Sequence, residues 1–163
     1  MMATMTARAC GTIALSLAGL LAGYADAGAA EPAGPTGSWV KAGMYDLRVK
    51  SVVRCAAARA GAADAGQHQL GIELEIRSHV RPLFVAPRDA ALWDGGVAFP
   101  AARPGTVPGC RPALRPSNLR RGGRASGFVV FALPARTGAL VLHYAPTRWG
   151  GSERVQIPIT PPR

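Results

Sequence analysis

The side chains with the clearest capacity for chemistry lie between Pro100 and Arg124. This stretch has five prolines, no acidic residue and six arginines, which are Arg103, Arg111, Arg115, Arg120, Arg121 and Arg124. Proline stiffens the backbone and removes hydrogen-bond donors, so the stretch is expected to stay outside a sheet. Guanidinium groups bind phosphate or carboxylate through paired hydrogen bonds. We therefore predict an anion-binding Pro/Arg-rich loop at residues 100–125. A solvated basic loop in a chain rich in Arg, Ala, Gly and Pro would look the same, and this alternative stays open.

Catalytic and metal-binding patterns are weak. The three histidines, His68, His79 and His143, are isolated from one another, and no paired His/Cys spacing occurs. Met44 is the only methionine after residue 5, which disfavours a copper site. No serine lies in a G-x-S-x-G motif. We predict no catalytic residue, no metal site and no cofactor; a small hydrolase is the weaker alternative.

Glu73 and Glu75 could in principle form an acid–base pair, because they are two residues apart. Residues at this spacing share one face of a strand. We interpret them instead as part of a solvated sheet face that balances nearby arginines.

The N-terminal residues have the order of an export signal. Arg8 precedes an apolar run from Ile13 to Ala25, and small-residue sites follow at 25–27 and 28–30. This order predicts a secretory signal peptide at residues 1–30 and a secreted or periplasmic protein. An uncleaved anchor is the alternative, but the apolar stretch is shorter than the ~20 residues that cross a bilayer. No later segment reaches that length.

The predicted export also indicates whether the cysteines are oxidised to a disulfide or remain free thiols. Removal of residues 1–30 takes away Cys10 and leaves Cys55 and Cys110. Two cysteines in an exported chain most simply form one disulfide, which would stabilise the fold by about 4 kcal/mol on the chain-entropy model. Two buried free thiols are the alternative.

The composition favours an all-β domain. Of 163 residues, 48% are apolar, and 20 Gly and 14 Pro disfavour long helices. Alternation is clearest in one strand, where the inward set is Leu70, Ile72, Leu74 and Ile76 and the outward set is Gln69, Glu73, Glu75 and Arg77. In a first strand we expect one face to hold Tyr45, Leu47, Val49, Val53 and Cys55.

Further strands are predicted at Leu83–Val85, Ala91–Trp93, Val97–Phe99, Phe128–Leu133, Leu140–Tyr144 and Val155–Ile159. Asp94, Gly95 and Gly96 predict a hairpin turn, and Phe128–Leu133 is apolar on both faces, as in a central or sandwich-interior strand. About seven strands without a helix predict a β-sandwich or barrel. We expect a flexible leader at residues 31–42 and one domain at residues 43–160.

Several of these segments resemble a known family. They are Tyr45-Asp-Leu-Arg-Val, the strand Leu70–Ile76, Ala91-Leu-Trp-Asp-Gly, Gly122-Gly123 with Gly127-Phe-Val-Val-Phe-Ala-Leu-Pro, and Leu140–Tyr144. The pattern, over residues 43–159, is similar to small secreted bacterial proteins grouped as immunoprotective extracellular domains after a mycobacterial antigen. The resemblance implies an immunoglobulin-like β-sandwich and no catalytic residue.

The expected function is therefore binding rather than catalysis. The leading interpretation is a secreted or periplasmic immunoglobulin-like module that contacts an anionic polymer or other anionic envelope component through the Pro/Arg-rich loop. The net charge of +10 would also suit nucleic acid, but the loop lacks interleaved aromatics and export removes that target. The alternative is an accessory subunit that docks on an envelope protein through an apolar sheet face. Trp93, Trp149 and Tyr144 are the candidate contacts, although core packing is favoured for Trp93 and Tyr144.

Overall fold

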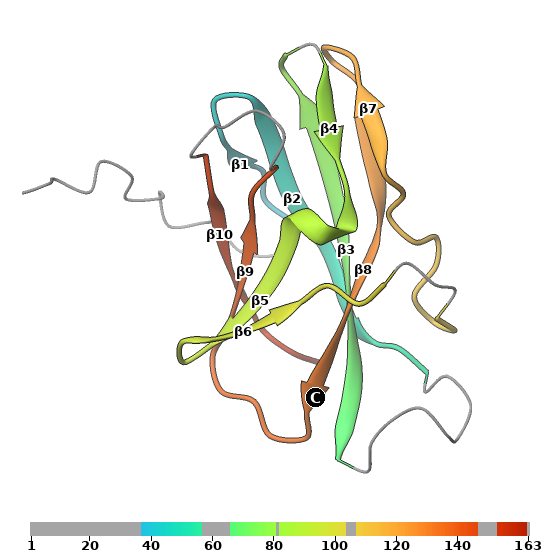
Figure 1. The fold of residues 1–163 in the computed structure, drawn as a ribbon, viewed down its shortest axis with the longest axis vertical. Coiled ribbons are helices and arrows are strands. Elements are labelled where there is room, and N and C mark those ends of the chain that lie inside the picture. The colour runs from blue at the N-terminus through green and yellow to red at the C-terminus, as the bar shows by residue number, and fades with distance from the viewer. Residues whose placement is uncertain (1–36, 57–65, 81, 104–106, 147–152, 163) are drawn as a thin grey trace, which may run out of the picture.

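The computed structural model describes residues 37–56, 66–80, 82–103, 107–146 and 153–162 (Figure 1). Its elements are β1 (Val40–Lys41), β2 (Tyr45–Arg54), β3 (Gln67–Ser78), β4 (Leu83–Val85), the 3-10 turn η1 (Pro87–Asp89), β5 (Ala90–Asp94), β6 (Val97–Pro100), β7 (Ser117–Leu119), β8 (Arg124–Pro134), β9 (Leu140–Tyr144) and β10 (Val155–Ile159). In this part of the chain, no helix is long and apolar enough to span a membrane.

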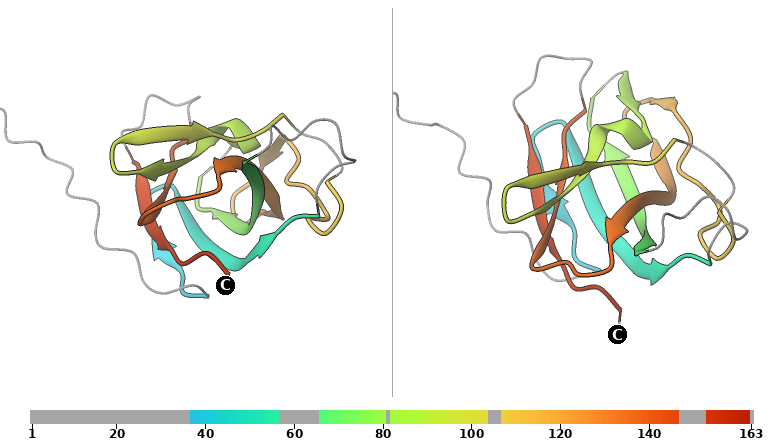
Figure 2. Two further views of the ribbon diagram at one scale, coloured as in Figure 1. Left: turned by 90° about the horizontal axis from the view of Figure 1, so that it is seen from below. Right: turned by 60° about the horizontal axis from the view of Figure 1, so that its bottom comes forward.

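The strands form a β-sandwich, as the alternating sequence predicts. A first sheet has the order β1-β2-β3-β8, a second has the order β10-β9-β5-β6, and β4 pairs with β7. Figure 2 shows β2 of the first sheet and the β5–β6 hairpin of the second on opposite sides of the molecule. The predicted all-β, immunoglobulin-like class is confirmed.

The main core lies between the two sheets. Leu70, Ile72, Leu74 and Ile76 of β3 are all fully buried there, as their spacing predicts. Tyr45 and Tyr144, from opposite sheets, meet edge to face with ring centroids 5.7 Å apart. The Tyr45 hydroxyl donates to the backbone oxygens of Tyr144 and Glu153 at 3.2 and 3.0 Å. Side chains far apart in the sequence therefore close the sandwich.

Because β2 contains a β-bulge, the side chains of its second half face the opposite side of the sheet from the one predicted. Val49 pairs with Leu74 and Ser51 with Glu73, so Lys50 is an extra residue. One extra residue reverses the faces of all later side chains. Val53 and Cys55 therefore do not share the core face of Tyr45, Leu47 and Val49, as expected from simple alternation. They lie on the outer face of the first sheet.

The bulge brings Cys55 to the place where Cys110 can reach it. The two residues form the predicted disulfide, with Cα atoms 5.5 Å apart. It lies over Gly71 of β3, where an added Cβ would be 2.3 Å from the Cys110 sulfur and 2.9 Å from that of Cys55. Glycine is required at this position because any side chain would occupy the space of the sulfurs.

The disulfide is part of a second apolar cluster. Cys55 and Cys110 are buried here with Phe128 and Val130 of β8, while Val129, Phe131 and Leu133 face the main core. The first four residues of the apolar run, Phe128–Phe131, are therefore buried on both faces, although β8 is the outermost strand of its sheet and Ala132 is exposed.

The segment after Cys110 closes the free edge of β8. Phe128 N–H donates to Pro112 O at 2.8 Å, and Leu114 N–H donates to Phe128 O at 2.9 Å. Leu114 is buried in the main core. A Cβ at Gly127 would lie 2.4 Å from the Leu114 nitrogen, so this glycine permits the close crossing.

Two predicted boundaries are wrong. Val40 and Lys41, assigned to the flexible leader, pair with Leu47 and Asp46 as β1. Ser117–Leu119, inside the predicted Pro/Arg-rich loop, pairs with Leu83–Val85, and Arg124 already begins β8. Ser117–Leu119 contains no proline, so its backbone can still form a ladder. The predicted signal peptide at residues 1–30 lies outside the described residues.

The predicted β5–β6 hairpin is confirmed. Asp94 pairs with Val97 around Gly95 and Gly96, whose φ values are +54° and +100°. Two consecutive positive φ values match the two-residue turn that suits the twist of a hairpin.

We predict that removal of the disulfide in the double variant Cys55→Ala/Cys110→Ala lowers the free energy of unfolding by about 4 kcal/mol. The reason is the long loop that the bridge closes, with a sequence separation of 55 residues. Urea unfolding followed by circular dichroism measures the change. A loss below about 1 kcal/mol would contradict a stabilising bridge.

Gly71→Ala should be costly only while the disulfide is present. Overpacking at the sulfurs is expected to cost about 1–3 kcal/mol in the oxidised protein. In the Cys55→Ala/Cys110→Ala background the same substitution should cost much less, and a double-mutant cycle measures the difference. Equal costs in both backgrounds would show that the sulfurs do not exclude the methyl group.

Candidate functional site

The six arginines predicted as an anion site are all exposed, but they do not converge on one point. Arg120 and Arg121 occupy the turn between β7 and β8, and Arg124 begins β8 opposite Arg77 of β3. Arg111 follows Cys110 directly, and Arg115 follows the buried Leu114. Arg103 lies on the segment after β6. The six arginines therefore lie in three places: the β7–β8 turn, the edge of β8 and the segment after β6.

The turn that carries Arg120 and Arg121 is fixed to the end of β3. Gly122 N–H donates to Ser78 O at 2.8 Å, and Ser78 N–H donates to Gly123 O at 3.0 Å. Gly122 has a φ of +77°, which glycine adopts without strain. The two arginines are thus presented from a hydrogen-bonded turn.

Other basic side chains are neutralised on the outer face of the first sheet. Arg48 Nε donates to Glu75 Oε2 at 2.8 Å, and Lys50 Nζ donates to Glu73 Oε1 at 2.7 Å. The hydrogen bond from Lys50 holds the pKa of Glu73 below its ordinary value. Arg124 Nη1 lies 3.6 Å from Glu75 Oε1. Glu73 and Glu75 are therefore partners in ion pairs, as the sheet-face interpretation predicts.

Histidine and tyrosine side chains offer no catalytic arrangement in the described residues. His79 Nε2, just after the end of β3, lies 2.9 Å from Asp46 Oδ1 of β2. Burial raises the pKa of the Tyr45 and Tyr144 hydroxyls, so both stay protonated near neutral pH. Among the residues that the structure describes, no group of three or more His, Cys, Asp or Glu side chains could hold a metal ion.

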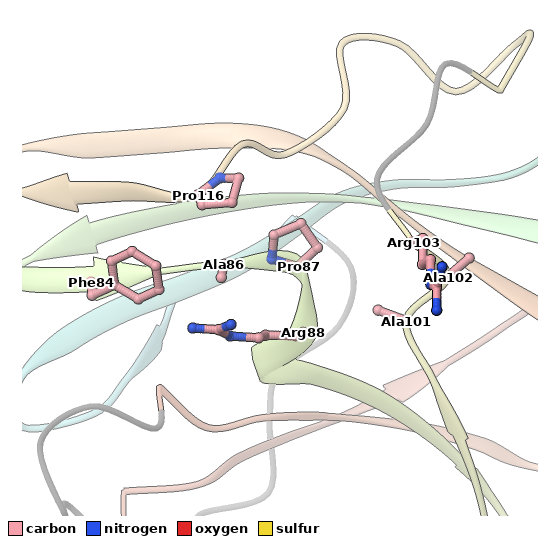
Figure 3. Close-up of a pocket in the computed structure, with 8 residues that line it drawn as sticks. All are labelled: Phe84, Ala86, Pro87, Arg88, Ala101, Ala102, Arg103 and Pro116. Atoms are coloured by element: carbon pink, nitrogen blue, oxygen red, sulfur yellow. The ribbon is translucent and has the colours of Figure 1, made fainter.

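A hollow of about 270 Å³ lies beside Arg103 (Figure 3). One wall comes from β4 and η1, and the other comes from the segment after β6. The lining consists of Phe84, Ala86, Pro87, Arg88, Ala101, Ala102, Arg103 and Pro116. It is apolar apart from two guanidinium groups, and no carboxylate is among these residues.

Arg88 is held against the hollow by an aromatic ring. Its guanidinium carbon lies 5.6 Å from the centroid of Phe84. The neighbouring Asp89 is buried, and its carboxylate accepts the Ala86 N–H at 2.8 Å. Figure 3 shows the Arg88 guanidinium reaching back toward Phe84, with Arg103 across from it beside Ala101 and Ala102.

Sequence reasoning found only Arg103 of this lining. Phe84 lies in the predicted strand Leu83–Val85. Nothing in the sequence, however, indicates that this strand lies beside the residues that follow β6. Arg88 lies outside the arginine-rich stretch. Their approach depends on sheet order, which local sequence patterns do not specify.

The outer face of the second sheet is uncharged at its centre. Cross-strand register places Pro158, Val141, Trp93 and Ala98 in one row, with Gln156, His143, Ala91 and Pro100 beside it. Trp93 is only partly buried, so its predicted place in the core is wrong. It stacks on His143 at a centroid distance of 5.1 Å. Tyr144 is in the core, as favoured, and Trp149 lies outside the described residues.

Known structures share this fold at low sequence identity. A putative lipoprotein (ycdA) of Bacillus subtilis has a TM-score of 0.61 and 18% identity, over 71% of this chain and 36% of that one. The secreted protein MPT63 of Mycobacterium tuberculosis has a TM-score of 0.58 and 14% identity, over 81% and 99%. The yjhA protein of Bacillus subtilis has a TM-score of 0.58 and 16% identity, over 77% and 98%.

These likenesses establish the fold. They confirm, at the level of fold, the resemblance to a secreted mycobacterial antigen that the sequence motifs indicate. The chain spans about a third of the length of the Bacillus lipoprotein. No family model matches the sequence, and no curated protein matches it.

The His143–Trp93 stack predicts an acid-sensitive contribution to stability. Burial, followed by the charge of Arg154, lowers the pKa of His143. Folding therefore favours the neutral imidazole, and this contribution is lost as the pH falls from the ordinary histidine pKa of about 6.5 through the lowered pKa of the folded protein. His143→Gln should flatten the decrease in melting temperature between pH 7 and pH 5.

His143→Arg provides the opposite control, because arginine stays charged throughout this range. It should lower the melting temperature already at pH 8. Identical pH profiles for the wild type and His143→Gln would refute a contribution from this histidine.

Proposed function

We propose that this chain is a secreted or envelope-located, non-enzymatic module that binds a phosphate-bearing polymer through the exposed arginines of residues 101–124. The signal-like order of residues 1–30 supports export. Two proteins of the same fold are described as secreted or as a lipoprotein, which fits such a location. The proposal concerns binding because the described residues offer no catalytic constellation.

The contrast between two sets of basic residues carries the proposal. Arg48 and Lys50 are paired with carboxylates on the outer face of the first sheet. In contrast, the sequence from Ala101 to Arg124 contains six arginines and no acid, and each of these arginines is exposed. Arg124 is the exception to the contrast, because it lies 3.6 Å from Glu75, so the proposal rests on the other five. Charges that the domain does not neutralise attract anions, while a compensated face does not.

The arrangement suits a polymer better than a single small anion. Arg120 and Arg121 lie on one turn, whereas Arg111 and Arg115 lie along the β8 edge. A flexible chain of phosphates can contact separated guanidinium groups in succession. Each contact releases condensed counterions, so affinity should depend strongly on salt concentration.

We predict that the triple variant Arg115→Gln/Arg120→Gln/Arg121→Gln binds inorganic polyphosphate at least about ten-fold more weakly. The slope of log affinity against log salt should fall by up to about three, one for each lost contact. Fluorescence anisotropy with labelled polyphosphate over a salt series measures both quantities.

The matched control is Arg54→Gln/Arg136→Gln/Arg154→Gln, which removes the same charge from other exposed positions. Similar losses in both triple variants would indicate attraction by net charge alone and would overturn a localised site. Poly-glutamate serves as the second probe. A preference for it over polyphosphate would indicate an acidic protein as the partner instead.

A second candidate function is docking on an envelope protein through the outer face of the second sheet. The uncharged rows around Trp93 favour it, because charge is depleted at the centre of protein interfaces. Tyr144, considered earlier as a contact, is buried and unavailable. Docking through this face should be insensitive to salt, which separates it from polyphosphate binding.

A further inference from the structure

We propose that the hollow between Phe84, Arg88 and Arg103 is a binding site for one small amphiphilic anion: a short apolar chain or ring that ends in an oxyanion. This inference rests on the proposed function to the extent that Arg103 belongs to the same basic segment. It adds a second, discrete site with its own ligand chemistry.

The size of the hollow limits the ligand. The hollow has a volume of about 270 Å³. Sites for drug-sized ligands begin at about 300 Å³. A chain of about six carbons or one ring therefore fits, whereas a large cofactor does not.

The residues that line the hollow indicate that most of the ligand is apolar. Phe84, Pro87, Ala101 and Pro116 present carbon to the hollow, together with the methyl groups of Ala86 and Ala102. Burial of apolar surface there gains about 25 cal/mol per Å². Inorganic phosphate alone cannot use this surface, so it should bind weakly.

The two guanidinium groups specify the anionic end. Arg88 is placed by its contact with Phe84, and Arg103 stands on the opposite wall (Figure 3). Both are exposed. A guanidinium that lies over a ring can still direct its N–H groups to a phosphate or carboxylate and bind it through paired hydrogen bonds. No carboxylate lines the hollow to compete for them.

The hollow is built on anchored backbone. Ala102 N–H donates to Val130 O of β8 at 2.7 Å, and Asp89 N–H donates to Ala86 O at 3.1 Å. Ala86 and Pro87 are themselves buried. The walls should therefore keep their separation without a ligand, which lowers the ordering cost of binding.

The test is a set of calorimetric titrations of the purified protein with hexyl phosphate, and with hexanol and inorganic phosphate, which represent its apolar and anionic parts. Hexyl phosphate should bind at least about ten-fold more tightly than either half. Equal affinities for hexyl phosphate and inorganic phosphate would overturn the site, because the apolar walls would then contribute nothing.

Two variants locate the binding. Arg88→Gln/Arg103→Gln should reduce hexyl phosphate affinity to the level of hexanol, while Arg54→Gln/Arg136→Gln leaves it unchanged. Ala102→Trp fills the hollow from an exposed position and should abolish hexyl phosphate binding with polyphosphate binding retained. Unaltered hexyl phosphate binding in Ala102→Trp would place the ligand elsewhere and overturn the inference.

The same series separates the two proposals. Arg115→Gln/Arg120→Gln/Arg121→Gln should weaken polyphosphate binding but leave hexyl phosphate affinity intact. A competition arm with phosphatidate vesicles distinguishes the source of the ligand: displacement of hexyl phosphate indicates a lipid headgroup, and no displacement indicates a soluble molecule.

Discussion

The disulfide between Cys55 and Cys110 lies directly on Gly71, at the middle of the longest strand of the first sheet. This contact holds a proline-rich segment, which has few backbone donors, against the outside of the sandwich. Phe128 and Val130 are then covered on the outer face, and Leu114 enters the main core at Gly127. The free edge of β8 is closed by the same segment. A single covalent contact thus gives β8 the two-sided burial that its apolar sequence requires.

The same anchoring separates two kinds of surface. On the first sheet, acids and bases alternate and neutralise each other, as in the Arg48–Glu75 pair. The anchored segment carries its arginines on ordered backbone without acids in its own sequence. Its continuation from Pro116 meets β4 and η1, where the hollow forms. Both proposed binding sites therefore lie around the part of the chain that the disulfide holds.

Much of the sandwich follows from local patterns, since the alternation in β3, β9 and β10 depends only on neighbouring residues. The bulge at Lys50 could not be predicted, because an extra residue is defined by its partner strand. The core position predicted for Trp93 is wrong for a related reason. An aromatic residue in a strand suits either face of the sheet, and the register with the neighbouring strands decides which face it occupies. The arginines of the candidate site could be found by composition. Phe84 and Arg88 could not, because the hollow depends on the order of strands across the fold.

The prolines at the two borders of the second sheet limit how the domain can assemble. β6 ends at Pro100, and β10 contains Pro158; both strands are outermost in that sheet. A proline has no N–H to offer to an incoming strand, so both borders are poor templates for edge-to-edge growth. These prolines therefore disfavour edge-to-edge aggregation of the folded domain. Any partner of this sheet must approach it broadside.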